Sequence, residues 1–185
     1  MSEEINKAPS ETSLSIEVCT NPDAADALAA LGAASFTEAF GHLYKRDDLE
    51  AFLRDNHAPE RYRRLIADPQ CRIWTAFAGD GALAAYAVAR PCALPVKDMP
   101  PRAGELSRLY ALRAFQGAGL GRRLLEAALA WLDRTFDHVY LSVYAENHGA
   151  MRLYRRYGFE TIASYSFMVG DHADPEYLMK RIRRG

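Results

Sequence analysis

One segment, residues 105–133, constrains the fold of this chain more strongly than any other. Its first part, residues 106–112, is an apolar run typical of a strand, and a glycine-rich turn follows at residues 116–121. An amphipathic helix comes next, with an apolar stripe at four-residue spacing: Leu120, Leu124, Ala128 and Leu132. Such a turn presents unpaired backbone N–H groups at the positive end of a helix dipole. The segment therefore predicts a strand, a phosphate-binding loop and a helix.

Two common phosphate-binding motifs do not fit this loop. A Walker loop requires Lys and then Ser or Thr after its last glycine, but Gly121 is followed by Arg122 and Arg123. A dinucleotide fingerprint requires the pattern G-x-G-x-x-G, and Arg122 occupies the place of its third glycine. Counted from Gln116, the pattern is instead Gln-x-x-Gly-x-Gly, with glycines at 119 and 121. The loop is therefore of a third type.

A second segment, residues 138–159, follows the helix of the first. Residues 138–144 alternate as a strand, with the two valines and the leucine on one face. Asn147 then fits a helix N-cap, and Gly158 fits the residue just past the C-terminus of that helix. The resulting pattern is Asn-x-x-Ala-x-x-x-Tyr-x-x-x-Gly-Phe, which ends at Phe159.

In their order and spacing, the two patterns resemble the signatures of the GNAT family of N-acetyltransferases, which bind acetyl-CoA. The resemblance implies an α/β fold in which a central mixed, twisted β-sheet of about seven strands is flanked by helices on both faces. It also implies that the strand and helix of residues 138–158 splay away from their neighbours, so that the pantetheine arm of the coenzyme enters the gap.

The rest of the chain predicts a single domain over residues 13–185 with the order β-α-α-α-β-β-β-α-β-α-β-β. Residues 1–12 are polar, so we expect a disordered tail and no secretory signal. The other expected strands cover residues 14–20, 71–78, 82–90, 161–169 and 176–182. The first three helices are expected to begin at Asn21, at Asp47 or Asp48, and at Pro59.

Composition excludes several classes of protein. A chain of 185 residues with 49% hydrophobic and 25% charged residues is typical of one globular α/β domain. No apolar run approaches the roughly 20 residues that cross a bilayer. The three cysteines, Cys19, Cys71 and Cys92, lack metal-ligand spacing, so we expect no metal site and a cytoplasmic protein. The basic residues are scattered, which disfavours nucleic-acid binding.

Charge is distributed unevenly. Residues 1–60 hold 12 acidic residues against 4 Lys or Arg, whereas residues 61–185 hold 12 against 19. A basic C-terminal part suits a polyanionic coenzyme, and an acidic N-terminal part suits a cationic acceptor. Several further stretches resemble the PaiA type of spermidine/spermine N-acetyltransferase: Phe36-Thr-Glu-Ala-Phe40, Asp48-Leu49, Phe52-Leu53, Arg108-Leu-Tyr110, Phe115-Gln116, residues 164–171 and Leu178-Met-Lys180. This resemblance implies a small polyamine acceptor.

The family resemblance also implies residues that bind acetyl-CoA. The backbone at the end of the motif strand should pair with the pantetheine amides and polarise the thioester; these residues are Leu109, Tyr110 and Ala111. The loop should bind the pyrophosphate through its N–H groups; its residues are Gln116, Gly117, Ala118, Gly119, Leu120 and Gly121. Arg122 adds positive charge there, and Asn147 should contact the pantetheine arm.

Acetyl transfer to an amine needs a group that protonates the departing thiolate and a group that takes the proton of the amine. Tyr154 stands where the family places its general acid, and Glu105 is our candidate base, acting through a water molecule. Glu38, Asp47 and Asp48 are candidates for binding the acceptor. Direct transfer, without an acyl-enzyme, is implied.

Other functions stay open at this point. The chain could be a GNAT enzyme that acts on a protein N-terminus or an aminoglycoside, because this fold changes acceptors by altering its helical wall and loops. It could also be a non-catalytic acetyl-CoA-binding regulatory module. The sequence leaves a homodimer open as well.

Overall fold

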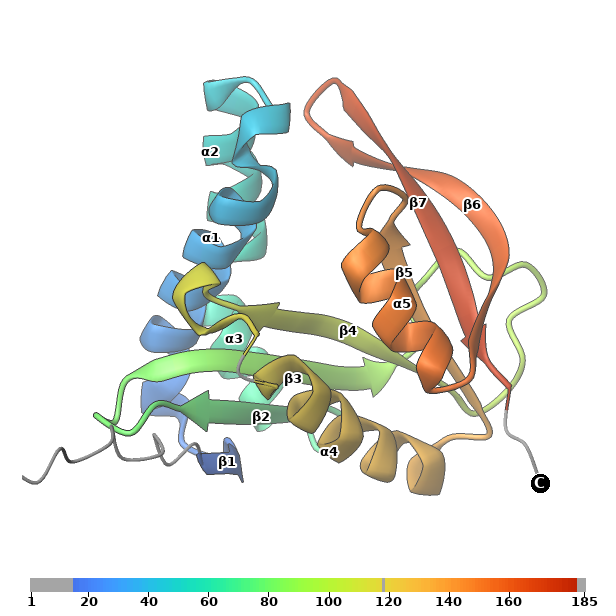
Figure 1. Ribbon diagram of the computed structural model, residues 1–185, viewed down its shortest axis with the longest axis horizontal. Helices are drawn as coiled ribbons and strands as arrows, with labels where there is room; N and C mark the ends of the chain where they lie inside the picture. The colour runs from blue at the N-terminus through green and yellow to red at the C-terminus, as the bar shows by residue number, and fades with distance from the viewer. Residues whose placement is uncertain (1–14, 118, 183–185) are drawn as a thin grey trace, which may run out of the picture.

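The computed structural model describes residues 15–117 and 119–182. In this part of the chain, seven strands form one twisted sheet in the order β1-β2-β3-β4-β5-β7-β6 (Figure 1). The strands are β1 (Ser15–Val18), β2 (Arg72–Phe77), β3 (Leu83–Pro91), β4 (Ala103–Ala111), β5 (His138–Tyr144), β6 (Phe159–Val169) and β7 (His172–Arg181). Neighbouring strands are antiparallel, except for the parallel pair β4 and β5. The predicted tail, residues 1–12, lies outside the described residues.

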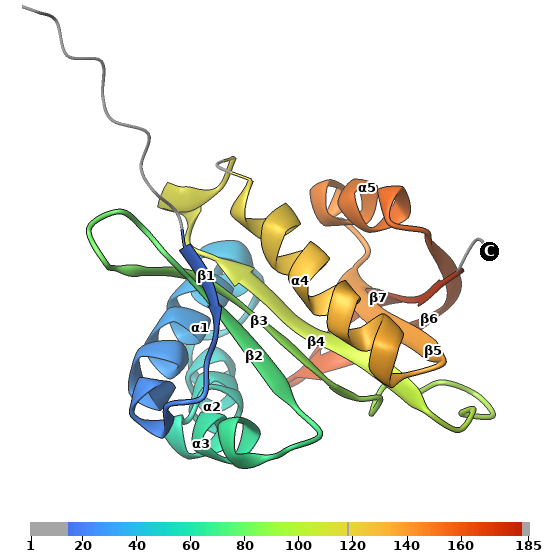
Figure 2. The ribbon, with the colours of Figure 1, turned by 90° about the horizontal axis from the view of Figure 1, so that it is seen from below.

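Helices cover both faces of the sheet, as predicted (Figure 2). One face carries α1 (Ala25–Phe40), α2 (Arg46–Asn56) and α3 (Pro59–Ala67), and the other carries α4 (Leu120–Thr135) and α5 (His148–Arg156). Short 3₁₀ turns precede α1, follow α1 and follow β4: η1 (Pro22–Ala24), η2 (Gly41–Leu43) and η3 (Arg113–Phe115). Asn147 caps α5, because its side chain accepts a hydrogen bond from the Ala150 N–H at 3.1 Å.

The core lies in two layers, one on each side of the sheet. The apolar stripe of α4 is buried against β2, β3, β4 and β5, with Leu124, Ala128 and Leu132 fully shielded from solvent. Burial of one such leucine stabilises the fold by about 1.5–3 kcal/mol. The second layer joins α1 and α3 to the other face around Leu28, Tyr62 and other buried side chains.

The two parallel strands separate halfway along their length. Residues 103–106 of β4 pair with residues 138–141 of β5, and the register ends there although both strands continue. Ser107 is an extra residue in the pairing of β4 with β3, because Val88 lies opposite Arg108 and Ala89 lies opposite Leu106. Such a bulge bends its strand and re-aims the following side chains. The splay predicted from the family resemblance is therefore present.

The hairpin of β6 and β7 is longer than the sequence predicted. We expected the last strand to begin at residue 176, after Pro175, but β7 begins at His172 and pairs with β6 from the turn onward. The carbonyl oxygen of Pro175 accepts a hydrogen bond from the N–H of Ala145, at the end of β5. In an extended strand the N–H and C=O of one residue point to the same side, so the N–H that proline lacks would face β5. The hydrogen bonds between β7 and β6 are therefore all kept.

Candidate active site

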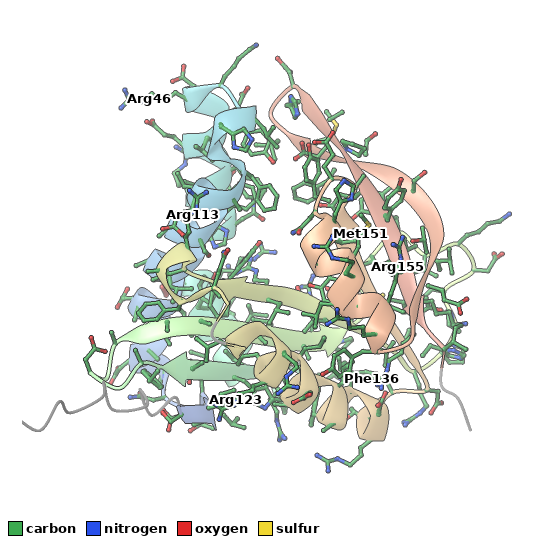
Figure 3. All side chains as sticks on the ribbon, viewed as in Figure 1. Arg46, Arg113, Arg123, Phe136, Met151 and Arg155 are labelled. Carbon is green, nitrogen blue, oxygen red and sulfur yellow. The ribbon has the colours of Figure 1, made fainter. Side chains whose placement is uncertain are left out.

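A cleft of about 420 Å³ lies along the gap where β4 and β5 separate. Its floor is β4 from Glu105 to Ala111. One wall consists of α1, Tyr44 and α2, and the other consists of β5, α5 and the β6–β7 hairpin. Figure 3 shows side chains from α1 and α2 and from the hairpin that extend toward one another across the opening. The splay thus gives the molecule one large concave site in the described part of the chain.

The predicted coenzyme residues gather at one end of this cleft. Six of them line it: Leu109, Tyr110, Ala111, Gln116, Gly121 and Asn147. Gly117 and Gly119 line the open turn before α4, with left-handed φ angles of 86° and 77°. Leu120 is instead buried under the loop and anchors it, and Arg122 is exposed in the first turn of α4. Ala118 lies outside the described residues.

The loop has the geometry of an anion site. A Cβ placed on Gly117, Gly119 or Gly121 would meet nothing within 4 Å, so the space above the loop is open to a ligand. The first turn of α4 carries no acidic residue. Its first hydrogen bond runs from the Arg123 N–H to the Gly119 carbonyl oxygen at 3.1 Å, which leaves the amides before Arg123 without a partner inside the helix. These features fit the pyrophosphate of acetyl-CoA.

Tyr154 lies on α5 and lines the same cleft. Its ring packs edge-on against Phe159 at 6.0 Å between centroids, and the residue is 8% exposed. Burial raises the pKa of its phenol above the ordinary value of 10, and Tyr110 adds to that rise. The phenol is therefore protonated at neutral pH, as a proton donor must be.

Glu105 lies in β4, at the floor of the cleft, but its carboxylate is fully engaged. One oxygen accepts a hydrogen bond from Arg90 Nε at 2.7 Å, and the other accepts one from the Ala93 N–H at 2.9 Å. The residue is 1% exposed. The structure therefore gives the candidate base two strong partners that hold it in place, which the sequence did not indicate.

The three predicted acceptor-binding carboxylates are not among the residues that line the cleft. Glu38 is exposed on α1 and accepts a hydrogen bond from the Arg113 N–H at 2.8 Å, so it ties α1 to η3 (Figure 3 labels Arg113). Asp47 and Asp48 lie in the first turn of α2, in a separate small hollow beside Asp171 at the hairpin turn.

Two other carboxylates occupy the acceptor end of the cleft, and the sequence did not single them out. Asp174 and Glu176 are alternate residues of β7, so they project from one face of the sheet. Asp174 is 4% exposed; it accepts a hydrogen bond from the Tyr44 hydroxyl and lies 3.1 Å from His172 Nε2. Period-two alternation could have paired them, but only the strand order brings β7 beside β5.

Aromatic rings surround these carboxylates. The rings come from α1, the residue after η2, α2, β5 and β6: Phe36, Phe40, Tyr44, Phe52, Tyr144, Tyr165 and Phe167. Phe36 stacks on Phe52 at 4.6 Å between ring centroids, and Phe52 meets Phe167 edge-on at 5.8 Å. The acceptor end is therefore an aromatic enclosure with two carboxylates, which suits a cation.

A buried polar network lies behind the floor of the cleft. His57 Nδ1 lies 2.9 Å from the Tyr62 hydroxyl, which lies 2.6 Å from the Tyr86 hydroxyl. The Arg108 guanidinium lies 5.0 Å from the centre of the Tyr62 ring and donates to the carbonyl oxygen of Asn56 at 2.8 Å. Burial, together with the positive charge of Arg108, lowers the pKa of His57 to about 3. His57 is therefore a neutral structural residue.

Two kinds of site are absent from the described part of the chain. Residues 15–117 and 119–182 contain no group of three or more His, Cys, Asp or Glu side chains that could hold a metal ion. Nor does any helix within these ranges have the length and apolar character needed to span a membrane.

Comparisons with known proteins give the family and the relatives of this chain. The profile of the acetyltransferase (GNAT) family matches residues 36–159. An uncharacterized N-acetyltransferase of Mycobacterium tuberculosis is 30% identical over 158 residues, which cover 85% of this chain and 96% of that protein. The spermine/spermidine N(1)-acetyltransferase of Bacillus subtilis is 37% identical over 57 residues, 30% of this chain and 38% of that protein.

The fold has a counterpart among solved structures. The PaiA N-acetyltransferase of Thermoplasma acidophilum, in complex with coenzyme A, superimposes with a TM-score of 0.70 at 20% identity. The match covers 90% of this chain and 98% of that one. At this level of identity the likeness shows a shared fold.

Proposed function

This chain belongs to the acetyltransferase (GNAT) family and is an acetyl-CoA-dependent N-acetyltransferase, and we propose that its acceptor is a small polyamine such as spermidine or spermine. The observation that carries this proposal is the pair of carboxylates, Asp174 and Glu176, inside an aromatic enclosure at the end of the cleft away from the glycine loop. A polycationic amine matches both the charge of this end and its apolar rings.

The coenzyme end supports direct transfer of the acetyl group. We propose that the amides around Gly119 and Gly121 bind the pyrophosphate and that Arg122 adds charge beside it. The backbone of residues 109–111 would pair with the pantetheine amides, because β4 has no partner strand there on its β5 side. Asn147 would contact the pantetheine arm from the start of α5.

Tyr154 is our proposed general acid. It lies on α5 in the wall of the cleft, and burial holds its phenol in the protonated form. As the C–S bond breaks, the thiolate that forms would take the proton of the Tyr154 phenol. None of the three cysteines, Cys19, Cys71 and Cys92, lines the cleft, which favours a mechanism without an acyl-enzyme.

Two observations support a polyamine acceptor: the activity named for a relative, and the carboxylates that line the cleft. The Bacillus subtilis relative acts on spermine and spermidine, although the match covers 30% of this chain. The structure also changes which carboxylates we assign to the acceptor. Glu38, Asp47 and Asp48 lie outside the cleft, so they can attract a cation only from a distance, whereas Asp174 lies inside it. We therefore expect Asp174 to contact the acceptor.

The test is the release of free thiol from acetyl-CoA with a panel of amines. We expect spermidine and spermine to have lower KM values than monoamines of similar length. Added salt should raise KM for the polyamines, because exposed charges are screened over about 8–10 Å at 0.10–0.15 M ionic strength. Asp174→Asn should raise KM for spermidine more than for a monoamine, whereas Asp171→Asn, an exposed carboxylate at the hairpin turn, should not.

Other outcomes select the other functions. Preference for a peptide with a free N-terminus, or for an aminoglycoside, over polyamines would reject the polyamine proposal and keep the acetyltransferase. Tight binding of acetyl-CoA without turnover of any of these acceptors would favour a regulatory module. Location in the cytoplasm and assembly as a homodimer stay predictions from the sequence.

A further inference from the structure

We propose that Glu176 of β7 takes the proton of the acceptor amine, and that Ser142 and Tyr165 are positioning residues that hold its carboxylate. This role requires acetyl transfer to an amine but not that the amine is a polyamine. Neither the sequence motifs nor the comparisons with known proteins point to Glu176.

The strand order places Glu176 at the mouth of the splay. β7 lies beside β5, and Glu176 is opposite Tyr144, the last residue of β5. On its other side Glu176 is opposite Tyr165 of β6. Ser142 comes two residues before Tyr144, so its side chain projects from the same face of the sheet. All four residues line the cleft, and the Glu176 carboxylate thus reaches into the gap above β4.

Two hydroxyl groups hold this carboxylate. Ser142 donates a hydrogen bond to Glu176 Oε2, and the Tyr165 hydroxyl donates a second to the same oxygen at 3.1 Å. Ser142 Oγ and the Tyr165 hydroxyl are themselves 2.8 Å apart. Both hydrogen bonds to the carboxylate are therefore to Oε2. The structure gives no hydrogen bond to Oε1, among the described residues, that would compete with an incoming amine.

The other carboxylates near the cleft are less suited to the task. Both oxygens of Glu105 already accept hydrogen bonds, from Arg90 Nε and from the Ala93 N–H, so neither is free to take a proton from an amine. Asp174 lies beyond the end of β5, under the Tyr44 hydroxyl and beside His172. In the described part of the chain, the neighbours of the Glu176 carboxylate are Ser142, Tyr165 and Asp174, and none of them is a cation.

The surroundings of Glu176 suit a base that works at neutral pH. Burial raises its pKa to about 7; the bond from Tyr165 opposes this rise, and Asp174 adds to it. The other ionisable groups that line the cleft come from each neighbouring element: Tyr44 after η2, His57 after α2, Arg61 of α3, Arg90 of β3, Glu105, Arg108 and Tyr110 of β4, Tyr144 of β5, and Tyr154 of α5. Burial raises the pKa of Tyr110 to about 12, and the negative charge of Glu176 adds to that rise. The Glu176 carboxylate therefore acts on a residue of β4.

Glu176 and Tyr154 together balance the protons of the reaction. An amine that enters as an ammonium ion gives one proton to the Glu176 carboxylate, which releases it to solvent. The neutral amine nitrogen then forms the C–N bond while the C–S bond breaks, and the surplus proton of the nitrogen passes to Glu176. Tyr154 gives its proton to the departing sulfur and regains one through solvent from Glu176. One proton is released for each charged amine acetylated.

The first test is the pH dependence of the single-turnover rate with saturating acetyl-CoA and acceptor. In the wild type, we expect this rate to rise with pH through a midpoint near 7, because Glu176 must be deprotonated. Glu176→Gln should remove this limb and lower the rate about 10²–10⁴-fold, the usual range for a lost general base. The matched control is Glu160→Gln, which removes an exposed carboxylate of β6 outside the cleft and should leave the profile unchanged.

A second variant separates a proton-transfer role from a structural one. Tyr165→Phe removes a hydrogen bond that favours the charged carboxylate, so the midpoint of the limb should move to higher pH. A limb that persists in Glu176→Gln, or that disappears in Glu105→Gln instead, would overturn the proposal and leave the acetyltransferase intact.

A third measurement does not depend on turnover. In protein with ¹³C-labelled glutamate carboxyl groups, one resonance should titrate near pH 7 and be missing from Glu176→Gln. If the Glu176 resonance titrates below about pH 5, as ordinary glutamates do, Glu176 is not the base. Absence of activity with every amine would reject the proposed function. It would not by itself decide the protonation of Glu176, which this titration measures independently.

Discussion

Leu106 of β4 and Leu141 of β5 are the last residues in register between the two parallel strands. Beyond them β4 continues through Ser107, the extra residue of a bulge, to Ala111. The N–H and C=O groups that point toward β5 in this stretch therefore have no strand partner there. These groups line the cleft and are therefore available to pair with a ligand that carries amide groups. The pantetheine arm of acetyl-CoA is such a ligand.

Gly119→Asp should weaken acetyl-CoA binding at least tenfold. The new side chain would occupy the open space above the loop, and its negative charge would face the pyrophosphate. The matched control is Gly81→Asp, because Gly81 also has a left-handed φ and open space around it but lies in the β2–β3 turn. Both variants carry the same backbone strain. Calorimetry that gives equal affinities for the two variants would contradict the phosphate role of the loop.

Tyr154→Phe should lower kcat about 10- to 10⁴-fold with little change in acetyl-CoA affinity, if the phenol donates a proton to sulfur. The apolar ring contacts with Phe159 are kept in this variant. Tyr157→Phe is the matched control, since the Tyr157 hydroxyl bonds Glu126 outside the cleft. An unchanged kcat for Tyr154→Phe, under conditions where chemistry limits turnover, would make Tyr154 a packing residue.

The coenzyme end could be predicted because its signals are local. Glycines, the strand before them and the helix after them are adjacent in the sequence, and the structure places Gln116, Gly121 and Asn147 on one cleft as expected. The order of helices and strands was also predicted, since each element has its own periodicity and cap. Asn147, for example, caps α5 as its sequence position indicated.

The acceptor end could not be predicted in the same way. Glu176 becomes a cleft residue only because β7 inserts between β5 and β6, and strand order leaves no local trace in the sequence. Glu105 looked like a free carboxylate at a strand end, but Arg90 comes to lie opposite it through the pairing of β3 with β4. The last strand was expected to begin at Glu176, yet Pro175 also lies within β7, where its missing N–H faces the end of β5.

His57 should make the fold sensitive to acid. Its pKa in the folded state is about 3, below the ordinary 6.5, because burial and nearby arginines disfavour the charged ring. The unfolded chain therefore binds more protons below pH 6.5, so this contribution to stability is present above pH 6.5 and is lost as the pH falls toward 3. His57→Gln should reduce the slope of unfolding free energy between pH 4.5 and 6.5, by at most about 1.4 kcal/mol per pH unit. Urea unfolding at several pH values measures this slope.

Glu176 should have the opposite effect in nearly the same range. Its folded pKa of about 7 lies above the ordinary 4.5, so the folded chain binds more protons between these values. Its contribution to stability is present below pH 4.5 and is lost as the pH rises through 7. Glu176→Gln should therefore make stability rise more steeply with pH, by at most about 1.4 kcal/mol per pH unit. A slope that changes in the same direction as in His57→Gln would refute this assignment.

Gly32 should be intolerant of even one added methyl group. It lies buried in α1, directly against the network of His57, Tyr62 and Tyr86, and an added Cβ would lie 2.6 Å from the Tyr86 hydroxyl and overlap the other two. Alanine is favoured over glycine in a helix by about 1 kcal/mol. Overpacking costs about 1–3 kcal/mol, and the displaced hydroxyls would also lose their hydrogen bonds.

We therefore expect Gly32→Ala to lower the free energy of unfolding by about 1–3 kcal/mol, against the direction of helix propensity. Gly149→Ala is the matched control: Gly149 is exposed in the first turn of α5, and its added Cβ would approach only Asn147 Oδ1, at 3.9 Å. It should be neutral or stabilise the protein by up to about 1 kcal/mol.

Because Tyr62 also contacts Arg108 at the cleft floor, Gly32→Ala should raise KM for the acceptor more than for acetyl-CoA. Chemical denaturation and steady-state kinetics on the two variants test this. Equal stability of Gly32→Ala and the wild type would mean that α1 can shift away from the network without loss.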